Sequence, residues 1–153
     1  MDDNLKVVGT LTVKHFNEDN VLLNKQEIPN LVVLAGKSHI AGRITANAAS
    51  AGTSLDIMSH MGLGGDSTTP VAGDTVLGGE MGRVALASTT VAANTITYNA
   101  TFPGGTATGT VNEAGIFNNP SANSGTLLCR TVFADVNKGA SDAVVITWNV
   151  SVA

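Results

Sequence analysis

Hydrophobic and polar residues alternate along most of the chain, and a period of two is typical of half-buried β-strands. Segment 95–102 alternates most regularly. Its inner face is predicted to carry Ile96, Tyr98, Ala100 and Phe102. The pattern predicts strands at 5–14, 21–28, 57–63, 84–91, 95–102, 111–117, 127–133 and 143–152. Turn-rich segments are expected between them at 15–20, 46–54, 64–73, 103–110, 118–125 and 137–142.

Segment 31–45 shows a helical spacing instead, because its apolar positions recur every three to four residues. These positions are Val33, Lys37 (through its aliphatic stem), Ile40 and Ile44. Asn30 follows Pro29 and is the predicted N-cap of this helix. Gly36 and Gly42 each disfavour a helix by about 1 kcal/mol relative to alanine. We expect close packing of the helix on a sheet to account for these glycines.

The complete pattern predicts about eight short strands, with one short helix inserted after the second strand. It favours an all-β fold, an antiparallel two-sheet sandwich that is jelly-roll-like or immunoglobulin-like. An α/β fold is disfavoured because helices do not alternate with the strands. Since the sequence shows neither a linker nor an internal repeat, residues 1–153 are expected to form a single domain.

The composition indicates a weakly charged surface. Of 153 residues, 13% are charged and 4% are aromatic, and that charged fraction is about half of the share usual in soluble domains. Such a surface suits a protein that its neighbours cover in an assembly, and it equally suits a plain sandwich with little charge. The net charge of −4, without any run of Lys or Arg, disfavours nucleic-acid binding.

The chain shows no membrane or secretion signal. No apolar run approaches the ~18 residues that a membrane span needs. The N-terminus, MDDNLKVVGT, lacks the pattern of a signal peptide, so we expect synthesis in the cytoplasm. Cys129 is the single cysteine, which excludes an internal disulfide. We interpret it as a small buried residue of a strand rather than a reactive thiol.

Motifs for catalysis or cofactor binding are missing from the sequence. His15, His39 and His60 lack the short spacings of zinc ligands. The glycines at 62–65 lack the Gly-Lys-Ser/Thr ending of a phosphate loop. No Gly-x-Ser-x-Gly motif is present either. We therefore predict a protein that is not an enzyme and that uses no cofactor.

Three acidic residues between the third and fourth predicted strands require an explanation. Asp66, Asp74 and Glu80 lie close in sequence but lack the spacing of a twelve-residue calcium loop. A cation near Asp66 and Asp74 stays an open alternative. We interpret Asp74 as the cap of a short helical turn that runs to Met81, and Glu80 as the ion-pair partner of Arg83, three residues on.

Two further charged residues lie inside apolar strands. Glu113 belongs to VNEAGIFN and Arg130 to LLCRTVF. Because an unpaired buried charge is costly, we predict that Glu113 pairs with Arg130 across neighbouring strands, in a structural ion pair that Arg83 could extend.

Several segments resemble motifs of tailed-bacteriophage structural proteins. In MSHMGLGGDSTTPVAGDTVLGGEMGRVAL, a strand leads to a glycine-rich turn, then to an Asp-Thr-x-Leu-x-x-Glu stretch and an arginine. The matching residues are Gly64, Asp74, Thr75, Leu77, Glu80 and Arg83. Residues 113–118, EAGIFN, resemble the Glu-x-Gly-Leu-Phe-Asp motif of tail-collar fibre attachment domains. The opening hairpin with NLVVLAGKSHIAGRI and the closing LLCRTVFADVNKG and VVITWNV also fit, so the resemblance spans nearly the whole chain.

The resemblance implies a virion component that holds other proteins, with no catalytic residues to carry over. Fibre proteins of that family continue into a shaft and a receptor-binding tip, whereas this chain ends after the predicted sandwich. Two alternatives stay open: a tail or fibre-attachment subunit that is adaptor-like, and a cement protein that decorates the capsid and bridges major capsid subunits. A carbohydrate-binding adsorption module is a third, but Trp148 and Tyr98 fall on predicted core faces. We also expect a homo-oligomer, since the edges of a sandwich need pairing or cover.

Overall fold

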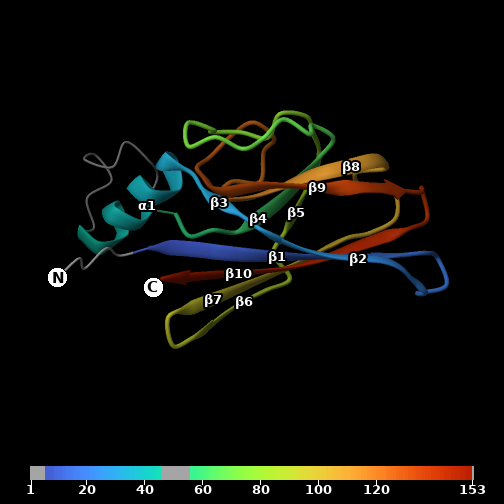
Figure 1. Ribbon diagram of the computed structural model, residues 1–153, viewed down its shortest axis with the longest axis horizontal. Helices are drawn as coiled ribbons and strands as arrows, with labels where there is room; N and C mark the ends of the chain where they lie inside the picture. Colours follow the sequence, from blue (N-terminus) through green and yellow to red (C-terminus); the bar gives the residue numbers. More distant parts are fainter. Residues whose placement is uncertain (1–5, 46–55, 153) are drawn as a thin grey trace.

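The computed structural model describes residues 6–45 and 56–152, which form ten β-strands and one α-helix (Figure 1). Along the chain these are β1 (Val7–Phe16), β2 (Leu22–Pro29), β3 (Leu31–Val32), α1 (Leu34–Thr45), β4 (His60–Gly64), β5 (Glu80–Ala85), β6 (Ser88–Ala92), β7 (Thr95–Phe102), β8 (Gly109–Phe117), β9 (Leu127–Lys138) and β10 (Ala143–Val152). The predicted all-β fold with one inserted helix is confirmed. The predicted strand start at Leu5 and the predicted loop 46–54 lie outside the described residues.

Two antiparallel sheets of five strands each pack face to face. Sheet A has the strand order β2-β1-β10-β7-β6, and sheet B has the order β3-β9-β8-β4-β5. Every pair of neighbouring strands in either sheet is antiparallel. The predicted two-sheet sandwich is therefore confirmed, with ten strands where the sequence indicated about eight.

Part of the difference arises because the predicted strand at 84–91 is two strands in two different sheets. β5 ends at Ala85 in sheet B, and β6 begins at Ser88 in sheet A. The two residues between them are bonded to opposite sides: Leu86 N–H donates to the Ser59 carbonyl at 2.9 Å, and Ala87 N–H donates to the Asn99 carbonyl at 2.7 Å. The apolar pattern continues through the crossing, so the sequence does not reveal it.

The hydrophobic core lies between the sheets, and its largest side chain is Trp148 on β10, which is fully buried. Trp148 is paired with Leu11 of β1 on one side and with Tyr98 of β7 on the other. The bounds of β7 and the inward direction of its alternate residues agree with the prediction. Cys129 is also fully buried on β9, as predicted, and burial raises the pKa of its thiol.

Helix α1 packs against β9 at one end of the sandwich (Figure 1). Gly36 lies directly on the Leu128 carbonyl, where a Cβ atom would overlap the backbone, so the predicted close packing at this glycine is confirmed. The helical face is rotated from the prediction, however. His39 is buried, whereas Ile44 is 77% exposed. No helix within 6–45 or 56–152 is long and apolar enough to cross a membrane.

The predicted N-cap, Asn30, is wrong. The backbone at Leu31–Val32 instead forms β3, which pairs with β9, so the helix begins only at Leu34. The N–H of Leu34 donates to the Ala72 carbonyl at 2.8 Å. Asn30 lies between β2 and β3, and its own N–H donates to the Gly9 carbonyl at 3.1 Å.

The first hairpin has a shorter turn than the predicted 15–20. β1 continues through His15 and Phe16, and the turn is closed by Asn17, whose Oδ1 accepts the N–H of Asp19 and of Val21. β2 also contacts sheet B, because the amide of Gln26 bonds both the N–H and the C=O of Ala134 on β9 at 2.9 Å each. This side chain occupies the free edge of β9 as a neighbouring strand would.

The outer face of sheet B is covered by the segment 65–79, hereafter the covering loop, between β4 and β5. A second apolar cluster lies beneath it, formed by Val33, Leu77, Phe117 and Leu127. Leu77 rests on the adjacent glycines Gly62 and Gly115 of β4 and β8. Every residue of β8 from Val111 to Phe117 is consequently buried, on both faces of the sheet.

We predict that Gly115→Ala destabilises the fold, because a Cβ at this position would lie 2.8 Å from Leu127 Cδ1 and 2.9 Å from Leu77 Cδ2. Overpacking of this kind costs about 1–3 kcal/mol, measurable by urea denaturation. Gly73→Ala is the matched control, since a Cβ there meets nothing within 4 Å. Equal stability of the two variants would contradict the close packing of Leu77 on sheet B.

Candidate functional site

The structure brings Glu113 and Arg130 together under the covering loop, and the predicted pair is confirmed. Glu113 lies on β8, and Arg130 lies on the neighbouring β9 opposite Gly115. Both side chains therefore occupy diagonal positions on the outer face of sheet B. Arg130 Nε donates to Glu113 Oε2 at 2.9 Å, and Nη2 lies 2.8 Å from the same oxygen.

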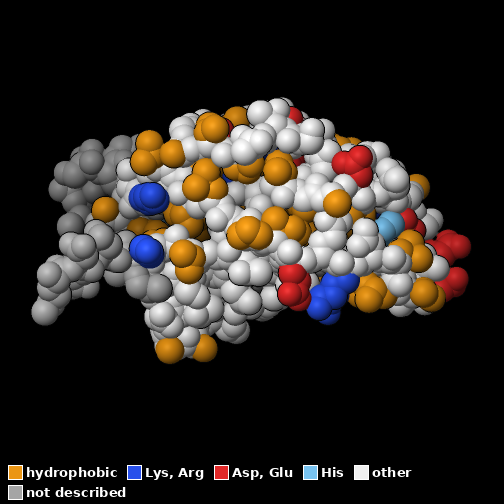
Figure 2. Space-filling view, viewed as in Figure 1, with side chains coloured by type: hydrophobic (Ala, Val, Ile, Leu, Met, Phe, Trp, Pro, Cys, Tyr) orange, Lys and Arg blue, Asp and Glu red, His pale blue; other side chains and the backbone are white. Residues whose placement is uncertain are grey.

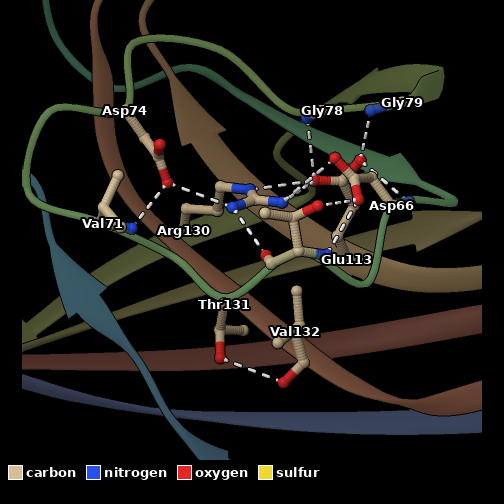
Figure 3. A network of polar contacts seen from close by, with 10 residues as sticks. Asp66, Val71, Asp74, Gly78, Gly79, Glu113, Arg130, Thr131 and Val132 are labelled. Carbon is tan, nitrogen blue, oxygen red and sulfur yellow. Dashed lines mark hydrogen bonds and ion pairs between the residues drawn. The ribbon is translucent and has the colours of Figure 1, made fainter.

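The Glu113 carboxylate is fully buried and also binds the covering loop (Figure 3). Its Oε2 accepts the N–H of Gly78 at 3.0 Å, and its Oε1 accepts the N–H of Gly79 at 2.6 Å and of Asp66 at 3.3 Å. Gly64 passes so close that a Cβ on it would overlap Oε1. One carboxylate thus fixes both ends of the loop.

Arg130 binds the middle of the same loop with its remaining nitrogen. Nη1 donates to Asp74 Oδ2 and to the Thr68 carbonyl, at 3.1 Å each. Asp66 Oδ2 lies 3.9 Å from Nη2. Figure 3 shows the guanidinium between Asp74 on one side and the Asp66 and Glu113 carboxylates on the other. The arginine is 3% exposed, and its charge is balanced by carboxylates around it.

Asp74 does not cap a helical turn, and that prediction is wrong, since residues 74–79 are not helical. Its carboxylate accepts the N–H of Val71 at 3.0 Å, and its own N–H donates to the Val71 carbonyl at 3.1 Å. Asp74 therefore closes a turn in the covering loop and presents the same oxygen to Arg130.

Glu80 and Arg83 form the second predicted ion pair, and their geometry is bidentate. Arg83 Nε and Nη2 donate to the two Glu80 oxygens at 2.7 and 2.8 Å. The guanidinium lies 3.6 Å above the Phe117 ring and donates through Nη1 to the Asn119 and Ser124 carbonyls. The suggested extension of the Glu113–Arg130 pair by Arg83 is not seen among these contacts, since Arg83 binds the β8–β9 connection instead.

The two segments that carry the phage resemblance are thus interlocked. Glu113 binds the backbone of Gly78 and Gly79, directly after Leu77, and Phe117 packs against Leu77 and under Arg83. Asn118 continues the second segment, since its Oδ1 accepts the Thr126 N–H at 2.7 Å. Thr75 of the first motif is exposed, and nothing in the structure explains it.

The Asp66 and Asp74 carboxylates both lie beside the Arg130 guanidinium. No group of three or more His, Cys, Asp or Glu side chains able to hold a metal occurs within 6–45 and 56–152. Thr68, through its hydroxyl and its N–H, lowers the pKa of the Asp66 carboxyl, and the Arg130 charge adds to that effect. Both carboxylates lie near the positive charge of Arg130 and accept backbone N–H groups in turns of the covering loop.

The three histidines lie apart. His15 Nε2 lies 2.8 Å from Asp142 Oδ2 at the β1–β10 end of sheet A, near the buried Lys138, whose Nζ donates to the Pro103 carbonyl at 2.9 Å. Burial lowers the pKa of Lys138, against the opposing effect of Asp142. His60 on β4 bonds Ser59, and burial followed by the Arg83 charge lowers its pKa.

The sequence did not indicate that glycines lie beneath Leu77 and Glu113. It also did not indicate that glycine N–H groups bind the Glu113 carboxylate. Gly62, Gly64 and Gly115 lack the side chains that would displace Leu77 or Glu113, and Gly78 and Gly79 offer bare N–H groups to the carboxylate. The only available signal was the density of glycines in 62–82, which also fits ordinary turns.

We compared the chain with protein families, curated proteins and solved structures. No protein-family model, no curated protein and no solved structure matches this chain.

We predict that Glu113→Gln lowers the free energy of unfolding by about 3 kcal/mol, because it leaves Arg130 buried without its main counter-charge. Urea denaturation measures the loss. The covering loop should also become more accessible, seen as faster proteolysis within 65–79.

The matched control is Glu27→Gln, which removes an equivalent carboxylate from an exposed pair with Lys25. An exposed pair is worth about 0.5 kcal/mol. If both variants lost the same small amount, the buried pair would not hold the loop.

We predict that Asp142 makes the fold sensitive to acid. The Gly139 N–H and the His15 ring lower the pKa of its carboxyl below the usual 3.8. A depressed folded-state pKa contributes stability at higher pH, and that stability is lost as the pH falls through about 4 and below. Asp142→Asn should therefore reduce the acid-induced fall in Tm measured by circular dichroism. Asp19→Asn, in the exposed β1–β2 turn, is the control and should retain the wild-type fall.

Proposed function

We propose that this chain is a non-enzymatic structural subunit of a tailed-bacteriophage particle, acting as a tail or fibre-attachment adaptor. The observation that carries the proposal is the interlock between the two segments that resemble phage structural proteins. Leu77 of the first segment packs with Phe117 of the second. Asp74 and Glu113 share Arg130, and Glu80 pairs with Arg83, which lies over the Phe117 ring. The resemblance thus rests on residues that act together.

The chemistry of this unit favours a structural role. Arg130, Glu113, Glu80 and Arg83 have side chains that are 3% exposed or less. These side chains bond one another and the backbone of the loops beside them, so the unit fixes a loop on a sheet. A scaffold that must keep its shape while holding neighbours needs this kind of rigidity.

The surface supports an assembly role as well. The face seen in Figure 2 carries few charged side chains and many scattered apolar ones. Val21, Leu22 and Leu23, at the β1–β2 turn, are exposed apolar residues. Clusters of exposed apolar residues often mark contacts with other proteins.

The carbohydrate-binding alternative is disfavoured by the aromatic side chains. Trp148 and Tyr98 are buried in the core, as predicted, and Phe102, Phe117 and Phe133 are buried as well. Sugar-binding surfaces commonly use exposed aromatic rings, and this sandwich offers at most the half-buried Phe16.

Counting the copies of the chain in purified phage particles tests the proposal and separates attachment from capsid cement. Quantitative mass spectrometry against the major capsid protein provides the count. An attachment subunit should occur in roughly a few to a few tens of copies, as cyclic tail symmetry requires. Antibody labelling of the particle by electron microscopy should place these copies on the tail.

Copies on the order of hundreds, spread over the head, would contradict the tail role and support a cement protein with the symmetry of the shell. Absence of the chain from purified particles would contradict both virion roles.

A further inference from the structure

The sandwich has four sheet edges, and three of them carry features that prevent pairing with another chain. β2 carries Lys25, Glu27 and Pro29. β3 is two residues long and leads into α1. β5 has a register shift opposite Leu63–Gly64.

The fourth edge, β6, has none of these features. Its sequence, Ser-Thr-Thr-Val-Ala, contains neither charge nor proline, and its register with β7 is regular over all five residues. All five are exposed, and Val91 is 70% exposed. β6 forms the outer edge of sheet A, at the bottom of Figure 1.

The open backbone groups of β6 follow from its turn. Ala92 and Thr95 flank the two-residue turn 93–94 and so form a hydrogen-bonded pair, and such pairs alternate along antiparallel strands. Ser88, Thr90 and Ala92 therefore direct their backbone groups at β7. Thr89 and Val91 direct theirs away from the sheet.

We propose that β6 is a self-pairing edge, which joins two copies of this chain in an antiparallel dimer about a twofold axis at Thr90. In this register Val91 of each copy faces Thr89 of the other, and the outward groups of these two residues meet as donors and acceptors. Thr90 of one copy faces Thr90 of the other. No charge opposes a like charge along the strand, so the edge is complementary to itself.

The inner face of β6 adds an apolar contribution. Thr89 and Val91 line an open cleft of about 640 Å³ that continues along Ile96 and Tyr98 of β7. Since directly opposite residues of antiparallel strands point to the same face, the dimer places Thr89 of one copy beside Val91 of the other at the mouth of this cleft. Two five-stranded sheets then become one continuous sheet of ten strands. The inference is independent of any role in a virion.

Thr90→Lys and Thr90→Glu test the pairing. Each places two like charges directly opposite one another across the twofold axis, so each should weaken dimerisation at least about fivefold in sedimentation equilibrium. An equimolar mixture of the two should form a heterodimer, because the opposed charges are then complementary. Thr10→Lys on β1, an exposed position in the same sheet, is the control and should dimerise like the wild type.

Thr90→Cys provides a geometric test. Non-hydrogen-bonded partners lie about 4.5 Å apart at Cα, within the range that a disulfide spans. Mild oxidation should give a covalent dimer, while the buried Cys129 leaves the wild type monomeric on a denaturing gel. Unchanged thermal stability of the variants shows that each monomer is intact.

Three outcomes would overturn the inference: a wild type that stays monomeric up to millimolar concentration, lysine and glutamate variants that dimerise as the wild type does, or a failure of their mixture to associate. Restoration of dimers only in the mixture supports it. Loss of self-pairing would leave the copy-number test of the virion role unaffected.

Discussion

The buried carboxylate of Glu113 is the group on which the outer layer of sheet B depends. Burying a charge without partners costs several kcal/mol, and this one is satisfied by Arg130 and by three backbone N–H groups of the covering loop. The charge can be buried only while the loop is in place, and the loop has its anchor only while the charge is there. The packing of Leu77 and the closure of β8 both follow from this mutual requirement.

The two sheets consequently differ in how they meet their surroundings. Sheet A keeps one face in the core and one toward solvent, where pairs such as Thr97–Asn149 and Thr147–Asn99 bond across neighbouring strands. Sheet B is covered on both faces along β8 from Val111 to Phe117, by sheet A and by the covering loop. Alternation is therefore regular along β7 and absent along β8, although both strands are antiparallel.

The part of the fold that depends on local pattern was predictable from the sequence. β7, the central position of Trp148 and the Glu113–Arg130 pair follow from alternation and from the cost of burying charge. The N-cap at Asn30 was wrong because Leu31–Val32 pair with β9, so the helix begins only at Leu34. The helical turn at Asp74 was wrong because its carboxylate bonds Arg130, far away in sequence. The crossing at Leu86–Ala87 also depends on contacts with distant strands, which no local window contains.

The covering loop is held at both ends by backbone N–H groups that bind Glu113, and in its middle by the Asp74 carboxylate, which bonds Arg130. Most of the residues between these contacts face solvent. Ser67, Thr69 and Val71 have exposed side chains, and a side chain at Gly73 would meet open space. The positions that shape the loop are thus separate from the positions that it displays. Its outer surface can therefore change in sequence without any change in the architecture beneath it.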